Sequence, residues 1–299
     1  MDIKDLTVFY EVAKEGSISH AARNLNYVQS NVTMRIKQLE NELGAPLFYR
    51  NGKGVTLTSN GEVLLTYAIQ ILSLMEQSIQ AVQNNSTHPK GTLKIGSTES
   101  TTAVRLPSIL TSYYETYPEV EFILETHSTE KLIQLVLERK LEGAFIAGNR
   151  HHPDLNSILF QEEELLLISK HPLSSFNDLG EMNLLAFSQG CYYRNLLENW
   201  LHEEGIYPKR VLEFGTIEAI LACVKSGMGI AIMIKSIIRD HEHSLALTPL
   251  PESFSRVPTT FIVRKDIFYS GALRRFIDRV TNTSYLIDKN HIHPHDYLS

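Results

Sequence analysis

Between residues 17 and 43, the apolar positions follow two short helical patterns that stand back to back. The first repeats at the i, i+3, i+4, i+7 spacing of one helix face and comprises Ile18, Ala21, Ala22 and Leu25. The second steps by four, three and four residues and comprises Val32, Ile36, Leu39 and Leu43. Only a tight turn fits between them. The spacing predicts a helix-turn-helix, although an ordinary helical hairpin has the same pattern.

The second predicted helix has a polar outer face, and Ser17 is the expected N-cap of the first. Polar side chains on such a face can donate and accept hydrogen bonds at base edges or reach phosphates. This helix is therefore the candidate reader of a DNA major groove. We expect the DNA-contacting residues on it to be Gln29, Ser30, Asn31, Thr33, Arg35 and Lys37.

The flanking segments strengthen this interpretation. A third amphipathic pattern precedes the pair, with Leu6, Phe9, Tyr10 and Ala13 on its apolar face. Gly44 supplies a helix stop after the second helix. Two short extended runs then enclose a glycine-rich turn, which predicts a β-hairpin wing with Arg50 and Lys53 at its tip. We expect both cations to contact DNA beside the major groove.

The first sixty or so residues resemble the DNA-binding domain of LysR-type transcriptional regulators. The resemblance is carried by LTVFYEVAKEGSISHAARNL, SNVTMRIKQLENELGAPLFYR and VTLTSNGEVLL, and it continues more loosely along the chain. Two positions depart from the family pattern: Met34 stands where many members have Arg, and Val28 where a hydroxyl residue is common.

The resemblance implies a winged helix-turn-helix, a long dimerising helix and a two-lobed α/β effector domain similar to periplasmic binding proteins. It also implies a homodimer or homotetramer that binds double-stranded DNA and a small-molecule effector. The domain boundaries expected from the sequence are 1–58 for DNA binding, 59–90 for the helix and hinge, and 91–299 for the effector domain.

Composition fits a regulator of this kind. The 299 residues suffice for about two domains, with 43% hydrophobic and 21% charged residues, as in globular proteins. The formal net charge is −6, but residues 20–60 hold five Lys and Arg against two Glu, a local excess of +3 that can neutralise phosphates. No apolar run is long enough for a membrane span and no signal-peptide pattern opens the chain, so we expect a cytoplasmic protein.

A long apolar helix is predicted over residues 59–84. Ser59 and Glu62 fit a capping box at its start, and the polar run NNSTHPKG follows its end. Its apolar residues leave little polar surface, so a second helix must cover it. A core helix of a globular domain would have the same composition, but the polar run that follows favours a dimer interface.

From Thr92 the pattern alternates between strands and helices, which predicts parallel α/β layers. The length predicts two lobes, one from about 91–161 and 265–299 and the other from about 162–264. The chain would cross between lobes near Glu162–Glu164 and return near Val263–Lys265.

Ligands of open α/β sheets bind beyond the carboxyl ends of the strands, at helix N-termini. The loops expected there are rich in hydroxyl groups, which together with backbone N–H groups suit a small anion such as a carboxylate. Helix N-caps would show the same residue types. The candidate effector-binding residues are Ser97, Thr98, Thr129, Gln189 and Arg194.

Other chemistry has weaker support. Cys191 lies near a helix start and could sense oxidants, but buried structural cysteines are commoner. The C-terminal tail has histidines at alternate positions, namely His291, His293 and His295. They could bind a metal ion, or the tail could be an ordinary polar terminus. No local motif of nucleophilic catalysis or phosphate binding is present, so we expect no enzyme, no cofactor and no metal. A solute-binding protein and a two-lobed enzyme with an added DNA-binding domain remain as alternatives.

Overall fold

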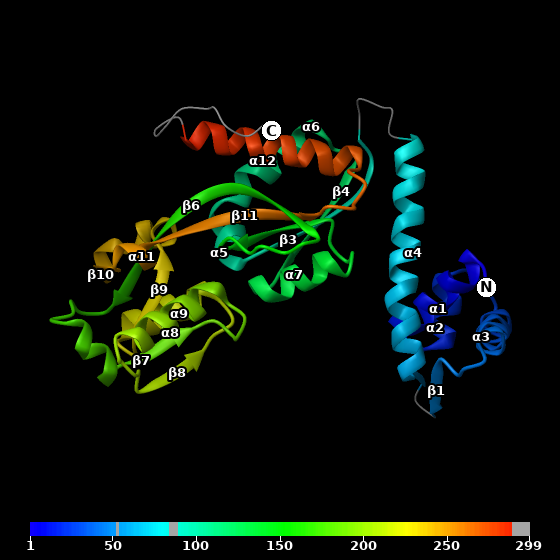
Figure 1. Ribbon diagram of the computed structural model, residues 1–299, viewed down its shortest axis with the longest axis horizontal. Helices are drawn as coiled ribbons and strands as arrows, with labels where there is room; N and C mark the ends of the chain where they lie inside the picture. The colour runs from blue at the N-terminus through cyan, green and yellow to red at the C-terminus, as the bar shows by residue number, and fades with distance from the viewer. Residues whose placement is uncertain (52–53, 84–88, 289–299) are drawn as a thin grey trace. The chain divides into compact units, whose positions relative to one another are not determined.

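The computed structural model describes residues 1–51, 54–83 and 89–288 (Figure 1). The chain folds as two compact units, Met1–Asn85 and Ser86–Ser299, which are taken separately below. Lys53 and the three histidines of the tail lie outside the described residues. Among the described helices, none combines the length and apolar content that a membrane span requires.

The first unit is a winged helix-turn-helix followed by a long helix. Its elements are α1 (Ile3–Glu15), α2 (Ile18–Asn24), α3 (Gln29–Leu43), the antiparallel hairpin β1 (Phe48–Asn51) and β2 (Gly54–Leu57), and α4 (Ser59–Gln83). The predicted apolar stripes point inward except at Leu43, which is exposed at the end of α3, and the helix-turn-helix prediction is confirmed. The core they form with α1 and the hairpin includes Phe9, Val12, Ala21, Val32, Ile36, Leu39 and Phe48.

Local capping explains where these helices begin. The Ser17 hydroxyl accepts a hydrogen bond from the His20 N–H at 3.4 Å, as predicted for an N-cap. The helix α4 begins at Ser59 as predicted, but its capping side chain is that of Thr58 rather than Ser59. The Thr58 hydroxyl accepts from the Gly61 N–H at 3.0 Å and donates to the Pro46 carbonyl at 2.7 Å, which ties the helix start to the loop before the wing.

The second unit is built on one long strand. A seven-stranded sheet has the order β10-β6-β11-β5-β3-β4, and β9 also pairs with β6. The strands are β3 (Gly91–Ser97), β4 (Val120–Thr126), β5 (Gly143–Ala147), β6 (Leu155–Ser169), β9 (Ala231–Ile234), β10 (Ala246–Pro249) and β11 (Arg256–Arg264). A parallel pair, β7 (Asn183–Ala186) and β8 (Arg210–Glu213), joins β9 through a bridge between Leu184 and Ile230.

Figure 1 shows β6 running from one lobe into the other. Its first part pairs with β11 as far as Glu164, and from Leu165 onward it pairs with β9. The first lobe thus contains β3, β4, β5, β11 and the start of β6. The second contains β7 to β10 and the end of β6, which gives the predicted two-lobed α/β fold.

Helices cover both lobes. The first lobe has α5 (Glu99–Val104), α6 (Leu106–Thr116), α7 (Thr129–Leu137) and α12 (Gly271–Asp288). The second has η1 (Phe176–Glu181), α8 (Tyr192–Glu203), α9 (Ile217–Ser226), α10 (Lys235–Ile238), η2 (Arg239–Ser244) and α11 (Glu252–Ser255). Phe145, Phe261 and Phe276 lie in the core of the first lobe, and Trp200 lies in that of the second.

Two expectations about the lobes need correction. The seven-stranded sheet is mixed: β3, β4 and β5 are parallel, whereas β6 and β11 are antiparallel to their neighbours. The return to the first lobe also comes before Val263–Lys265, because β11 already pairs with β5 at Thr259. The antiparallel place of β11 beside β5 is set by tertiary pairing that the local pattern of apolar residues does not show.

Candidate DNA interface and effector site

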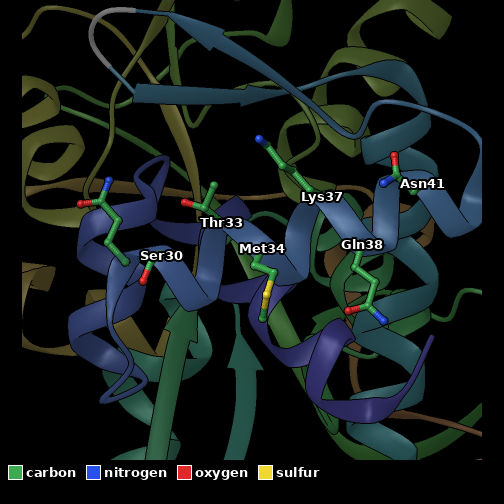
Figure 2. Close-up of a pocket in the computed structure, with 7 residues that line it drawn as sticks. Ser30, Thr33, Met34, Lys37, Gln38 and Asn41 are labelled. Carbon is green, nitrogen blue, oxygen red and sulfur yellow. The ribbon is translucent and has the colours of Figure 1, made fainter.

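The outer face of α3 forms a shallow, open groove. Figure 2 shows its side chains in succession along the helix. The lining residues are Gln29, Ser30, Thr33, Met34, Lys37, Gln38 and Asn41. Six of these seven side chains are polar, and Lys37 contributes a cation. The face can therefore donate and accept hydrogen bonds at base edges and also meet phosphates.

This face points outward because the opposite face of α3 is apolar. Val32, Ile36 and Leu39 are buried in the core shared with α1 and α2. Met34 lies in the middle of the groove and is 60% exposed. At the position where many family members have Arg, this chain thus presents an uncharged thioether, which suits apolar contact such as that with a thymine methyl group.

Arg35 does not lie on the groove. Its Nη1 donates to the Asp5 carboxylate of α1 at 2.7 Å, and the side chain is only 25% exposed. Asn31 is half-buried and also outside the groove lining. Arg35 sits beside the apolar stripe on the helix rather than opposite it. Of the predicted contacts on α3, Gln29, Ser30, Thr33 and Lys37 are the four that line the groove.

The wing contributes a further cation. Arg50 in β1 is 41% exposed, and its Nη2 lies 3.9 Å from the Glu40 carboxylate. Glu40 is already occupied by the backbone N–H groups of Leu47 and Phe48, at 2.9 and 3.3 Å. The long ion pair leaves the Arg50 guanidinium able to reach a phosphate.

The second unit holds a cavity of about 360 Å³ between its lobes. It lies where the parallel strands β3, β4, β5, β7 and β8 end, which is the expected place for a ligand of this fold. Its lining residues are Thr98, Glu99, Ser100, Thr126, His127, Ser128, Thr129, Lys131, Ala147, Phe187, Ser188, Cys191, Tyr192, Tyr193, Phe214 and Gly215.

Three helices start at this cavity. Their N-cap residues are Thr98 for α5, Ser128 for α7 and Cys191 for α8, and none of these three side chains makes a capping hydrogen bond. The first N–H groups of a helix have no intrahelical partner, and its N-terminus carries a partial positive charge. The cavity therefore presents hydrogen-bond donors suited to an anion.

The structure brings together only some of the predicted effector-binding residues. Thr98 and Thr129 line the cavity, and Gln189 does not. Ser97 is fully buried beneath the cavity wall and donates to the Thr98 carbonyl at 3.0 Å. Its hydroxyl is therefore used inside the protein.

Arg194 is also directed away from the cavity. Its guanidinium is buried and donates to the Glu213 and Glu198 carboxylates, at 2.6 and 2.8 Å, and to the Phe187 carbonyl at 3.0 Å. These partners satisfy its charge within the second lobe. The sequence suggested proximity to the site because Arg194 is close to a helix start, but the side chain turns to the other side of that helix.

Two of the cavity residues that were not among the predicted effector contacts bear on its chemistry. Glu99, in the first turn of α5, accepts a hydrogen bond from the Ile217 N–H of α9 at 2.9 Å and so connects the lobes. Tyr193 of α8 is only 7% exposed, yet its hydroxyl has no hydrogen-bond partner among the described residues. The signal for Glu99 was its place directly after a strand; nothing local marks Tyr193.

Cys191 lies in the same wall. Burial raises the pKa of its thiol, while the N–H groups of Arg194 and Tyr193 lower it. A raised pKa leaves less of the reactive thiolate at neutral pH, which weakens the case for oxidant sensing at this residue.

Comparison with known proteins decides the family. Residues 3–62 match the bacterial regulatory helix-turn-helix protein, lysR family, and residues 86–284 match the LysR substrate binding domain. The chain belongs to the LysR family of transcriptional regulators. As a LysR-type regulator, it combines DNA-binding and effector-binding domains and is not an enzyme. The alternatives of a solute-binding protein and a two-lobed enzyme are therefore excluded.

Similar LysR-type regulators match nearly the whole chain. An uncharacterized HTH-type transcriptional regulator YusT from Bacillus subtilis (strain 168) is 45% identical over 283 residues, covering 94% of this chain and 96% of the relative. HTH-type transcriptional regulator SoxR from Arthrobacter sp. (strain TE1826) is 43% identical, covering 94% and 97%. Full-length CbnR, solved in complex with its target DNA, has a TM-score of 0.68 at 23% identity and covers 95% of this chain and 100% of that one. This last likeness shows the fold.

Proposed function

We propose that this regulator reads its operator with the outer face of α3. The observation that carries the proposal is the exposed groove lined by Gln29, Ser30, Thr33, Met34, Lys37, Gln38 and Asn41. Side chains of α3 would enter the major groove, and Arg50 and Lys53 of the wing would hold the adjacent backbone. A protein with this task works in the cytoplasm, where its DNA is.

A second copy of the chain would complete the DNA-binding form. One side of α4 packs on the core of the first unit through Leu64, Leu65, Ala68 and Leu72. The other side leaves a row of apolar side chains exposed, namely Val63, Tyr67, Ile71, Leu74, Met75 and Ile79. An exposed apolar row on so long a helix is suited to packing against the same row of a second copy in a dimer. The two DNA-binding units of such a dimer can read two half-sites.

The effector would be a small anion in the cavity between the lobes, held by the starts of α7 and α8 and by hydroxyls such as Thr98 and Thr129. Binding on both sides of the cavity would favour one lobe geometry over another. That change would alter the spacing or bend that the oligomer imposes on DNA.

Fluorescence anisotropy with DNA from the region upstream of the gene tests the proposal. We expect sequence-selective binding that weakens steeply with salt, since phosphate contacts release counterions. Lys37→Ala should lower affinity about tenfold and reduce the salt slope by about one. Lys14→Ala, at an exposed lysine of α1 outside the groove, is the matched control and should leave affinity unchanged. Equal effects of the two variants would overturn the assignment of the α3 face.

A further inference from the structure

The cavity between the lobes contains one carboxylate, that of Glu99. It reaches from α5 in the first lobe to α9 in the second, where its Oε1 accepts from the Ile217 N–H at 2.9 Å. Its other oxygen receives no hydrogen bond from the part of the chain that the structure describes. Lys131, a cation in the same lining, instead donates to Gln134 at 3.2 Å.

Among the described residues, no cation forms an ion pair with this carboxylate. Burial raises the pKa of Glu99, the Ile217 N–H lowers it, and the nearby Glu218 carboxylate raises it. A carboxylate whose pKa is raised by burial is one whose charge is poorly solvated and unpaired. A ligand that brings a positive group into the cavity would supply the missing partner, and the pair would gain from the lower dielectric there.

Other hydrogen-bond acceptors line the same cavity as Glu99. The buried Tyr193 hydroxyl makes no close hydrogen bond among the described residues, and burial raises its pKa, while the nearby Ser100 and Thr259 hydroxyls lower it, so that it stays protonated and neutral. The Thr98 and Ser100 hydroxyls line the cavity within 3.4 Å of each other. An ammonium group carries three donors and requires several acceptors, which a carboxylate and hydroxyls provide.

The same cavity also holds groups of the reverse character. The uncapped starts of α7 and α8 and the Lys131 ammonium favour a negative group. The cavity thus holds partners for both a carboxylate and an amine. We infer that the effector is a small amine-bearing carboxylate, of amino-acid type, whose ammonium group binds Glu99. This inference rests on the proposed effector site and specifies the chemistry of its ligand.

Matched pairs of ligands test the inference on the full-length protein. The standard amino acids are screened by thermal shift, each beside the carboxylic acid that lacks its amine, such as glutarate beside glutamate, and binders are titrated by calorimetry. Glu99→Gln removes the charge but keeps an acceptor for the Ile217 N–H. Glu203→Gln is the control, because this carboxylate is exposed, does not line the cavity and does not act on Glu99.

We expect at least one amino acid to bind, and its amine-free partner to bind at least about tenfold more weakly. Glu99→Gln should weaken binding about tenfold, and Glu203→Gln should have no effect. An amine-free acid that binds as tightly as its amino acid would overturn the inference but leave an anionic effector in place. Unchanged binding in Glu99→Gln, or no binding by any amino acid, would also overturn it. None of these outcomes bears on the proposed DNA interface, which is judged by anisotropy.

Discussion

The outer face of α3 and the cavity between the lobes are built in opposite ways. The first is a set of side chains on one helix, from Gln29 to Asn41, held outward by an apolar stripe on the same helix. The second is assembled from the ends of five strands, with residues from Thr98 to Gly215 in the same wall. A site on one helix depends on local periodicity, whereas an assembled site depends on contacts between distant segments.

The largest expected effect removes one such distant contact. Arg105 of the first lobe donates to both oxygens of the buried Glu163 of β6 at 2.9 and 3.0 Å, and Ser236 of the second lobe lies 3.4 Å from the same carboxylate. Arg105→Ala would leave a buried carboxylate unpaired and should lower the free energy of unfolding by about 3 kcal/mol. Urea unfolding followed by fluorescence of Trp200, the single and buried tryptophan, measures this.

The matched control is Arg256→Ala. Arg256 lies 3.4 Å from Glu162, one residue away on the same strand, but both side chains are exposed to solvent. Exposed ion pairs contribute little, so the loss should stay below about 1 kcal/mol. If the two variants lowered the free energy of unfolding equally, the Arg105–Glu163 pair would not hold the lobes together as the comparison requires.

A smaller effect distinguishes neighbouring residues on α3. Arg35→Ala removes the hydrogen bond to the buried Asp5 and should destabilise the packing of α3 on α1 by about 2 kcal/mol. Met34→Ala removes a side chain that is mostly exposed, and should leave stability within about 0.5 kcal/mol. Amide hydrogen exchange in α1 and α3 reports both changes.

DNA affinity then separates the roles of these two residues. Met34→Ala should weaken binding in a manner that depends on operator sequence, since Met34 lies in the groove. Suppose that amide hydrogens of α1 and α3 exchanged no faster in Arg35→Ala than in the wild type, but that the variant lost its selectivity for the operator sequence. Arg35 would then contact bases directly.

The periodicity that revealed α3 was sufficient to exclude Arg35 and to include Met34. At about 100° per residue, Arg35 falls beside Val32 and Leu39, whereas Met34 and Asn41 fall opposite the stripe with Ser30 and Lys37. It does not separate Asn31 from Gln38, which fall at nearly the same angle although only Gln38 lines the groove. The charge of Arg35 alone suggests a DNA contact, whereas its angular position on the helix places it at the edge of the apolar face. The structure shows that the edge position is filled by a pair with Asp5.

The cavity could be predicted only in part. The rule that ligands lie beyond the ends of parallel strands led to Thr98 and Thr129, because both follow a predicted strand. It could not reveal Tyr193, which is brought to the wall by the packing of α8, nor tell that Arg194, the next residue, turns toward Glu213. Side-chain direction across an assembled site follows from tertiary contacts that no single segment encodes.

The smallest expected effect concerns the charge in the cavity. Because burial raises the pKa of Glu99 in the folded chain, the folded state holds this proton more tightly than the unfolded state does. Its contribution to stability is therefore fully present below the ordinary glutamate pKa and is lost as pH rises through the pKa of the folded state.

The wild-type protein should gain stability relative to Glu99→Gln when pH falls from neutral to the ordinary glutamate pKa, as measured by urea unfolding at a series of pH values. The backbone N–H of Ile217 opposes the shift and Glu218 adds to it, so the same series with Glu218→Gln should show a reduced gain. A difference between wild type and Glu99→Gln that stays constant with pH would mean that the cavity solvates this carboxylate as well as water does, and the two sites would then differ less in their electrostatics than in their assembly.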